Sequence, residues 1–153
     1  MKIFVDTNVI LEEFLQRENF YIAHRLFVLL HEQKHELYMS AGSFYTIIFL
    51  VDKFLRKELV LSGEERISEL RKIMSNILVS IQVAGHDNDC LLRGVRNMLF
   101  KDIEDGCQYE LAINADCEYL ITFNVSDYPE SPDATIKVLT PAEFVEQVSR
   151  SEV

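Results

Sequence analysis

The chain has 153 residues, of which 48% are hydrophobic and 26% charged, as in an ordinary globular protein with a proper core. Its formal net charge of -10 argues against broad electrostatic binding to nucleic acid, but not against a nuclease whose metal ions supply positive charge locally. No apolar run approaches the roughly 20 residues that span a bilayer, and Met1 and Lys2 lead directly into an apolar run, so we expect neither a membrane segment nor a signal peptide.

The first half of the chain alternates short β-prone runs with stretches whose apolar residues recur at helical spacing. The stretch after residue 43 is apolar on nearly all sides, so its helix should be buried in the core or by a second subunit. The expected order is a strand at 3–5, a helix at 9–16, a helix that Asn19 can cap and that ends in the polar run 31–35, a strand at 36–39, and a helix opened by 40–43 that continues through Leu55.

The second half contains two capping boxes, in which Ser62 is answered by Glu65 and Thr140 by Glu143. The expected order is a helix behind 62–65, a strand at 78–81, a helix from Asp87 or Asn88 through Leu99, a helix starting at 102–105, a strand at 118–122, turns at 123–128 and 131–133, a strand at 136–139, and a helix starting at 140–143. The helix through Leu99 should turn these apolar residues inward: Leu91, Leu92, Val95, Met98 and Leu99.

Strands separated by helices throughout the chain predict a parallel α/β sandwich. No internal repeat, low-complexity tract or linker rich in Gly, Pro or Ser interrupts the pattern. We therefore expect a single domain over residues 1–153.

Acidic residues follow the strands where a functional site is expected. Asp6 ends the first strand directly, and ligands of an open α/β sheet gather at the carboxyl ends of its strands. Other carboxylates could meet Asp6 at the same rim if the strand ends adjoin. They are Asp102, Glu104 and Asp105 at a helix start, and Asp127 after the fourth strand.

Clustered carboxylates repel one another and therefore tend to need a cation. Oxygen ligands without His or Cys favour Mg²⁺ or Mn²⁺, and such ions suit hydrolysis of a phosphodiester. The alternative is a purely structural role, because Asp caps helices and favours turns. Asp102 and Asp105 could only cap their helix, and Asp127 could only stabilise its turn, whereas a functional role is favoured for Asp6. The cysteines Cys90, Cys107 and Cys117 have no ligand spacing and indicate reduced thiols in a cytoplasmic protein.

The chain also resembles a known family, the PIN domains, in five segments that occur in the family's order. They are KIFVDTNVIL at 2–11, Ser40 and Ala41 before an apolar helix, DIED at 102–105 followed by Gln108, Ala112 and Ala115, YLITFNVSDY at 119–128, and VLTPAEF at 138–144. The resemblance implies a three-layer α/β/α sandwich with a central, mostly parallel sheet of about five strands. It also implies cleavage of RNA with Mg²⁺ or Mn²⁺.

Many small bacterial members of this family are similar to the toxin half of a toxin–antitoxin pair, working as dimers that an antitoxin silences. The resemblance therefore implies RNA, an antitoxin protein and a second copy of the chain as partners, and no membrane. By position, Asp6 and Asp105 match the first and third acidic metal ligands. Thr7 and Asn8 match the small polar residues that support the first ligand.

Two positions depart from the family's pattern. The second acidic position falls on Thr46 and the fourth on Asn124, and neither residue brings a charge. Asn124 and Thr46 are expected to complete a polar pocket around Asp6 and Asp105. Gly106 replaces the usual Ala after the third acid, which is expected to loosen that helix start. The remaining carboxylates could compensate by outer contacts: Asp102, Glu104 and Asp127.

The leading hypothesis is a divalent-metal-dependent endoribonuclease that hydrolyses RNA phosphodiesters with a metal-activated water. Its catalytic residues would be Asp6, Asp105 and Asn124. The alternative is a PIN-fold binding or regulatory module without nuclease activity, which the loss of an acid at Thr46 and the acidic composition favour. A Mg²⁺-dependent phosphatase or a nuclease of other specificity stands third.

Overall fold

The computed structural model describes residues 1–130 and 135–151, and within them a parallel five-stranded sheet organises the chain. The strand order is β3-β2-β1-β4-β5, so β1 lies in the centre. In the register of the sheet, Phe4 pairs with Tyr38 on one side and with Leu120 on the other. The strands are β1 (Lys2–Val5), β2 (Glu36–Met39), β3 (Gln82–Val83), β4 (Tyr119–Ile121) and β5 (Lys137–Leu139).

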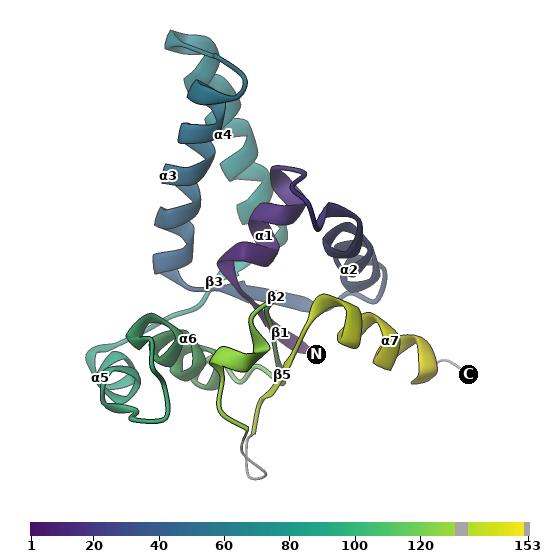
Figure 1. Ribbon diagram of the computed structural model, residues 1–153, viewed down its shortest axis with the longest axis vertical. Helices are drawn as coiled ribbons and strands as arrows, with labels where there is room; N and C mark the ends of the chain where they lie inside the picture. The colour runs from purple at the N-terminus through teal and green to yellow at the C-terminus, as the bar shows by residue number, and fades with distance from the viewer. Residues whose placement is uncertain (131–134, 152–153) are drawn as a thin grey trace.

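Helices cover both faces of this sheet, which confirms the predicted three-layer α/β/α fold (Figure 1). The helices α1, α2, α3, α4 and α7 pack on one face, whereas α5 and α6 pack on the other; α3 and α4 also extend beyond the sheet as a paired arm. Their bounds are α1 (Thr7–Phe14), α2 (Phe20–Glu32), α3 (Ala41–Lys57), α4 (Gly63–Ser80), α5 (Asn88–Arg96), α6 (Ile103–Asn114) and α7 (Pro141–Ser151).

The central strand contributes to both halves of the core because its side chains alternate between the two faces. Ile3 and Val5 pack against the larger set of helices, and Phe4 packs against α5 and α6. All three side chains are fully buried. The position of Asp6 at the end of this strand is therefore fixed by a core that surrounds the strand on every side.

The strand predicted at 78–81 is wrong, because α4 continues through Ser80. Met74, Ile77 and Ile81 are buried at helical spacing, whereas Val79 is 88% exposed. Helical packing on one face thus prevails over the β-propensity of the short apolar run. The edge strand β3 begins only at Gln82.

The helix predicted to run through Leu99 is also too long, and most of its apolar residues do not face inward. α5 ends at Arg96, and Leu92, Val95, Met98 and Leu99 are all at least partly exposed, from 42% to 93%. The buried face of α5 consists instead of small residues, Cys90 and Gly94, which lie against α6. Small residues allow the two helices to approach closely, and the larger apolar side chains consequently point outward.

The predicted helix starts differ in their capping. The box of Thr140 and Glu143 is confirmed, with the Thr140 amide 2.8 Å from the Glu143 carboxylate and the Glu143 amide 3.2 Å from Thr140 Oγ1. Ser62 and Asn19 stand at the expected cap positions, but neither side chain accepts a capping hydrogen bond. The turn predicted at 131–133 lies outside the described residues. Across the described ranges, no helix is long and apolar enough to cross a membrane.

Candidate functional site

Asp6 is held rigidly at the carboxyl end of β1. Its Oδ1 accepts a 2.7 Å hydrogen bond from the Thr7 amide, and its Oδ2 accepts a 2.9 Å bond from Thr122 Oγ1 at the end of β4. The Gln108 side chain on α6 also hydrogen-bonds this carboxylate. Burial raises the pKa of Asp6, while these hydrogen bonds oppose the rise by stabilising the charged form. The carboxylate is therefore positioned by three elements of the fold.

Thr7 contributes to the site through both its backbone amide and its hydroxyl group. Its amide contacts Asp6, but its Oγ1 donates a 2.7 Å hydrogen bond to Ser43 Oγ on α3. Ser40 Oγ donates to the same Ser43 oxygen at 2.8 Å and also caps α3. This buried chain of hydroxyl groups joins the start of α1 to the start of α3, so it stabilises the junction around Asp6.

Asp105 lies on the first turn of α6 and faces the same region as Asp6. Burial, followed by repulsion from Asp102, Asp6, Asp127 and Glu104, raises the pKa of Asp105 to about 6. Asp102, Asp105 and Asp127 line one cavity, and Asp6 is near enough for its charge to contribute to the raised pKa of Asp105. Asp102 also caps α6, because its Oδ1 accepts a 2.7 Å bond from the Glu104 amide.

Asn124 and Asp127 belong to the short 3-10 helix region (η1, Val125–Asp127) that follows β4. The Asn124 amide donates a 3.1 Å bond to Thr122 Oγ1, which is also the donor to Asp6. The loop is thereby connected to the Asp6 carboxylate through the Thr122 hydroxyl group. The side chains of both Asn124 and Asp127 are exposed, and Asp127 is close enough to raise the pKa of Asp6 and Asp105.

Thr46, Glu104 and Asn8 lie at the margin of the site. Thr46 is exposed on α3 and lines a hollow between α3 and α6 that Glu104 and Gln108 also line. Asp105 and Asp127 line a different cavity. Asn8 is exposed on α1. The structure thus places Asp102, Asp105 and Asp127 around one cavity and Thr46 beside another.

Sequence reasoning missed four residues around the carboxylates. Thr122 and Gln108 hydrogen-bond Asp6, while Lys101 and Tyr128 line the cavity beside Asp105. Gln108 follows Asp105 by three positions, which places both on one helical face and could have identified it. Its Oε1 is buried without a hydrogen-bond partner among the described residues, as is the hydroxyl of Tyr128.

The residues present fit a hard divalent cation. The donors are carboxylate and amide oxygens, and the crowded carboxylates have raised pKa values that a cation would relieve. Over residues 1–130 and 135–151, no three His, Cys, Asp or Glu side chains are arranged to hold a metal ion together. Mg²⁺ is commonly bound by one or two carboxylates and several waters, so Asp6 and Asp105 meet that requirement.

The protein is therefore an α/β/α sandwich with a parallel sheet and an acidic site at the carboxyl end of its central strand. The chain belongs to the PIN domain family, whose model matches residues 2–126. It is 31% identical over 150 residues to "Ribonuclease VapC1" of Aquifex aeolicus (strain VF5), a match that covers 95% of this chain and 94% of that protein.

Two solved structures have the same fold. A chain in the structure of VapBC2 from Rickettsia felis, bound to a DNA fragment from their promoter, aligns with a TM-score of 0.62 at 14% identity, covering 92% of this chain and 98% of that one. A chain in the structure of VapBC-1 from nontypeable Haemophilus influenzae aligns with a TM-score of 0.64 at 16% identity, covering 93% and 99%.

Proposed function

We propose that this protein is a divalent-metal-dependent endoribonuclease and the toxin component of a toxin–antitoxin pair. The observation that carries the proposal is the placement of the buried Asp6 at the end of the central strand, with Asp105 on the first turn of α6. Burial, followed by repulsion from Asp102 and then from Asp6, raises the pKa of Asp105 to about 6. A relative named a ribonuclease, aligned over nearly the whole chain, supports RNA as the substrate. Mg²⁺ and Mn²⁺ are both compatible with the oxygen donors.

In this proposal Asp6 and Asp105 hold the metal. When bound, the ion lowers the pKa of a water and offsets the charge that develops on the phosphodiester. Thr122 and the Thr7 amide keep the Asp6 carboxylate in one orientation through their hydrogen bonds. Asn124 is tied to the same Thr122 hydroxyl, and its exposed carboxamide is placed to orient the RNA backbone.

The outer residues have smaller roles in this mechanism. Asp102 and Asp127 add negative charge that strengthens cation binding at Asp105. Glu104, at the edge of the site, also adds negative charge near Asp105. Thr46 lines the neighbouring hollow and would contact bound RNA there instead of completing the metal shell. Asn8 is exposed on α1 and would contact RNA from that helix.

A metal-dependent cleavage assay tests this function. We expect RNA to be cut with Mg²⁺ or Mn²⁺ and not with EDTA, and both Asp6→Asn and Asp105→Asn to reduce the rate by at least about 100-fold. Asp116→Asn is the matched control, because Asp116 is exposed beyond α6, near the amino end of β4. It should retain the full rate.

The second candidate is a PIN-fold binding module without nuclease activity. Thr46 favours it, because that residue is uncharged and lines a different hollow from Asp105. Absence of cleavage with either metal, in a protein that still binds RNA or a partner chain, would establish this alternative. Cleavage that persists unchanged in both aspartate variants would instead indicate a contaminating nuclease.

We propose that the protein has two partners, an antitoxin protein and a second copy of this chain. We also propose that it consists of a single domain and is located in the cytoplasm. The two VapBC structures with this fold support an antitoxin. A short neighbouring reading frame that encodes a basic or DNA-binding protein would support the pairing. The homodimer is supported by the aromatic side chains that α3 leaves exposed.

A further inference from the structure

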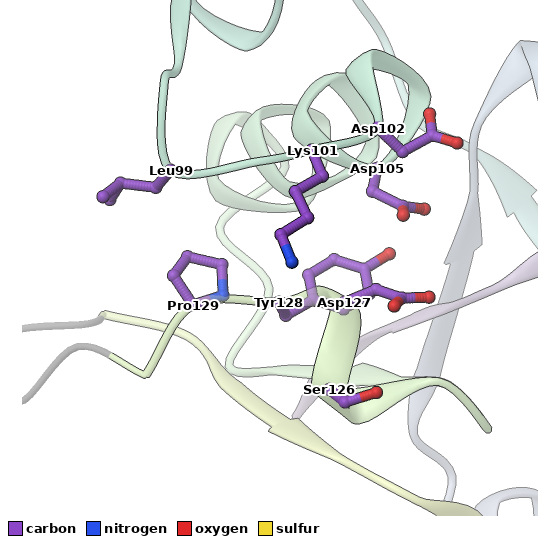
Figure 2. A pocket seen from close by; sticks show the side chains of 8 residues that line it. All are labelled: Leu99, Lys101, Asp102, Asp105, Ser126, Asp127, Tyr128 and Pro129. Carbon is purple, nitrogen blue, oxygen red and sulfur yellow. The ribbon is translucent and has the colours of Figure 1, made fainter.

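A cavity of about 300 Å³ lies immediately beside the carboxylates, between the loop before α6 and the segment after η1. Figure 2 shows Asp105 and Asp127 at one side of it, Leu99 and Pro129 at the other, and Lys101 between them. The cavity thus has an acidic wall and an apolar wall. Its volume is at the lower end of the range for small-ligand pockets, so it has room for about one nucleotide.

Lys101 is the cation of this cavity. Its ammonium group extends into the space toward Tyr128, and it forms no ion pair with any carboxylate among the described residues (Figure 2). A lysine that only balanced the nearby acids would be expected to pair with one of them. Its charge is instead available to an anion entering the cavity.

Tyr128 provides a second and independent indication of a ligand. The residue is only 6% exposed, and its hydroxyl has no hydrogen-bond partner within the part of the chain that the structure describes. In Figure 2 the hydroxyl points toward the carboxylates of Asp105 and Asp127. A buried hydroxyl without a hydrogen-bond partner destabilises the fold, so its retention at this wall calls for a functional explanation.

The apolar wall suits the remainder of a nucleotide. Leu99 is 69% exposed although it is a large apolar residue, and Pro129 lies on the same side of the cavity (Figure 2). Sugar carbons and a base face can pack against such a surface without any sequence requirement. A base can enter only if it is not stacked in a duplex, because proteins read individual RNA bases chiefly in single-stranded segments.

We propose that this cavity binds one unpaired nucleotide of the RNA, with its phosphate on the Lys101 ammonium and its ribose and base against Leu99 and Pro129. The inference rests on the proposed nuclease function, which it deepens by assigning Lys101, Leu99 and Pro129 to the binding of one nucleotide beside the carboxylates. In a protein with a net charge of -10, one correctly placed cation carries much of the phosphate binding.

The test measures binding of a short fluorescent single-stranded RNA at several salt concentrations in Mg²⁺, in an Asp6→Asn background that leaves the RNA uncut. Lys101→Met should weaken binding at low salt by at least about tenfold and reduce the slope of log K against log salt by about 0.7, the loss of one phosphate contact. Lys101→Arg should keep the slope. Lys57→Met, at the exposed end of α3, is the matched control and should change neither quantity.

Three results would overturn the proposal: equal behaviour of Lys101→Met and Lys57→Met, no measurable RNA binding in the background protein, or equal competition by a duplex of the same sequence. Failure of the nuclease function is distinguishable from these. In that case the protein with an intact Asp6 leaves RNA uncut, while the Lys101-dependent binding persists.

Discussion

Asp6 and Asp105 are carboxylates in surroundings that disfavour their charged forms. Burial is the largest cause for both, and the neighbouring acids add repulsion. For Asp6 the bonds from Thr122, the Thr7 amide and Gln108 partly compensate. Protons and metal ions therefore compete for Asp105, and a metal ion should bind poorly when the pH falls below about 6.

The raised pKa of Asp105 also predicts how stability depends on pH in metal-free protein. Its folded pKa of about 6 lies above the ordinary value of 3.8, so between these values the folded state binds more protons than the unfolded state. The free energy of unfolding should consequently fall as the pH rises from about 4 to above 6. Urea unfolding in EDTA over this range should show the fall, and Asp105→Asn should flatten it.

The Asp116→Asn protein provides the comparison for this measurement, because its exposed carboxylate lies away from the cluster. It should follow the original protein over the whole pH range. An Asp105→Asn protein with the same slope as the original would mean that this carboxylate titrates normally in the folded state.

At the scale of secondary-structure elements, the position of α6 depends on its close approach to α5. A Cβ atom added at Gly94 would lie 2.6 Å from Cys107 Cα, and one added at Gly106 would lie 2.7 Å from the Gly94 carbonyl oxygen. The expectation that Gly106 loosens the helix start stays a prediction, and the structure adds a packing reason for glycine at this position. Its missing side chain allows α6, which carries Asp105 and Gln108, to pack directly on α5.

Gly94→Ala should destabilise the fold by about 1–3 kcal/mol, because backbone atoms of α6 must shift to admit the methyl group. Gly85→Ala is the control, since a Cβ at that position meets nothing within 4 Å. Thermal or urea unfolding of both variants gives the comparison. Equal stability of the two would show that α5 moves away from α6 at little cost.

The parts of the fold that were predictable from the sequence are those in which local pattern and burial agree. The apolar run ending at Asp6 gave both the central strand and the first carboxylate, and Thr140 with Glu143 gave the start of α7. The pattern failed at 78–81, where β-propensity and helical packing conflict. Lys101 and Tyr128 could not be identified, because their importance arises only from the cavity that distant elements enclose.

At the scale of the whole molecule, α3 presents an aromatic surface that this chain alone does not cover. Its inward face is buried through Ile47, Val51 and Leu55, as the core required. Tyr45 and Phe49, one helical turn apart, are 70% and 62% exposed. This aromatic pair is the surface on which we propose that a second subunit packs.

Phe49→Asp should therefore shift the protein toward the monomer, because the substitution places a charge in the proposed interface. Sedimentation velocity over a range of protein concentrations measures the shift. Val79→Asp, on the exposed side of α4, is the control and should leave the dimer intact. A Phe49→Asp protein that dimerises like the control would assign the interface to another face.

The hydrogen bond from Thr122 to Asp6 joins residues that are 116 positions apart in the chain. Asp6 is translated well before β4, which pairs with β1 and supplies Thr122. A nascent chain that lacks β4 has neither Thr122 beside Asp6 nor the loop that carries Asn124. The centre proposed to cut RNA is consequently completed only after the ribosome that makes it has translated the chain through Asn124.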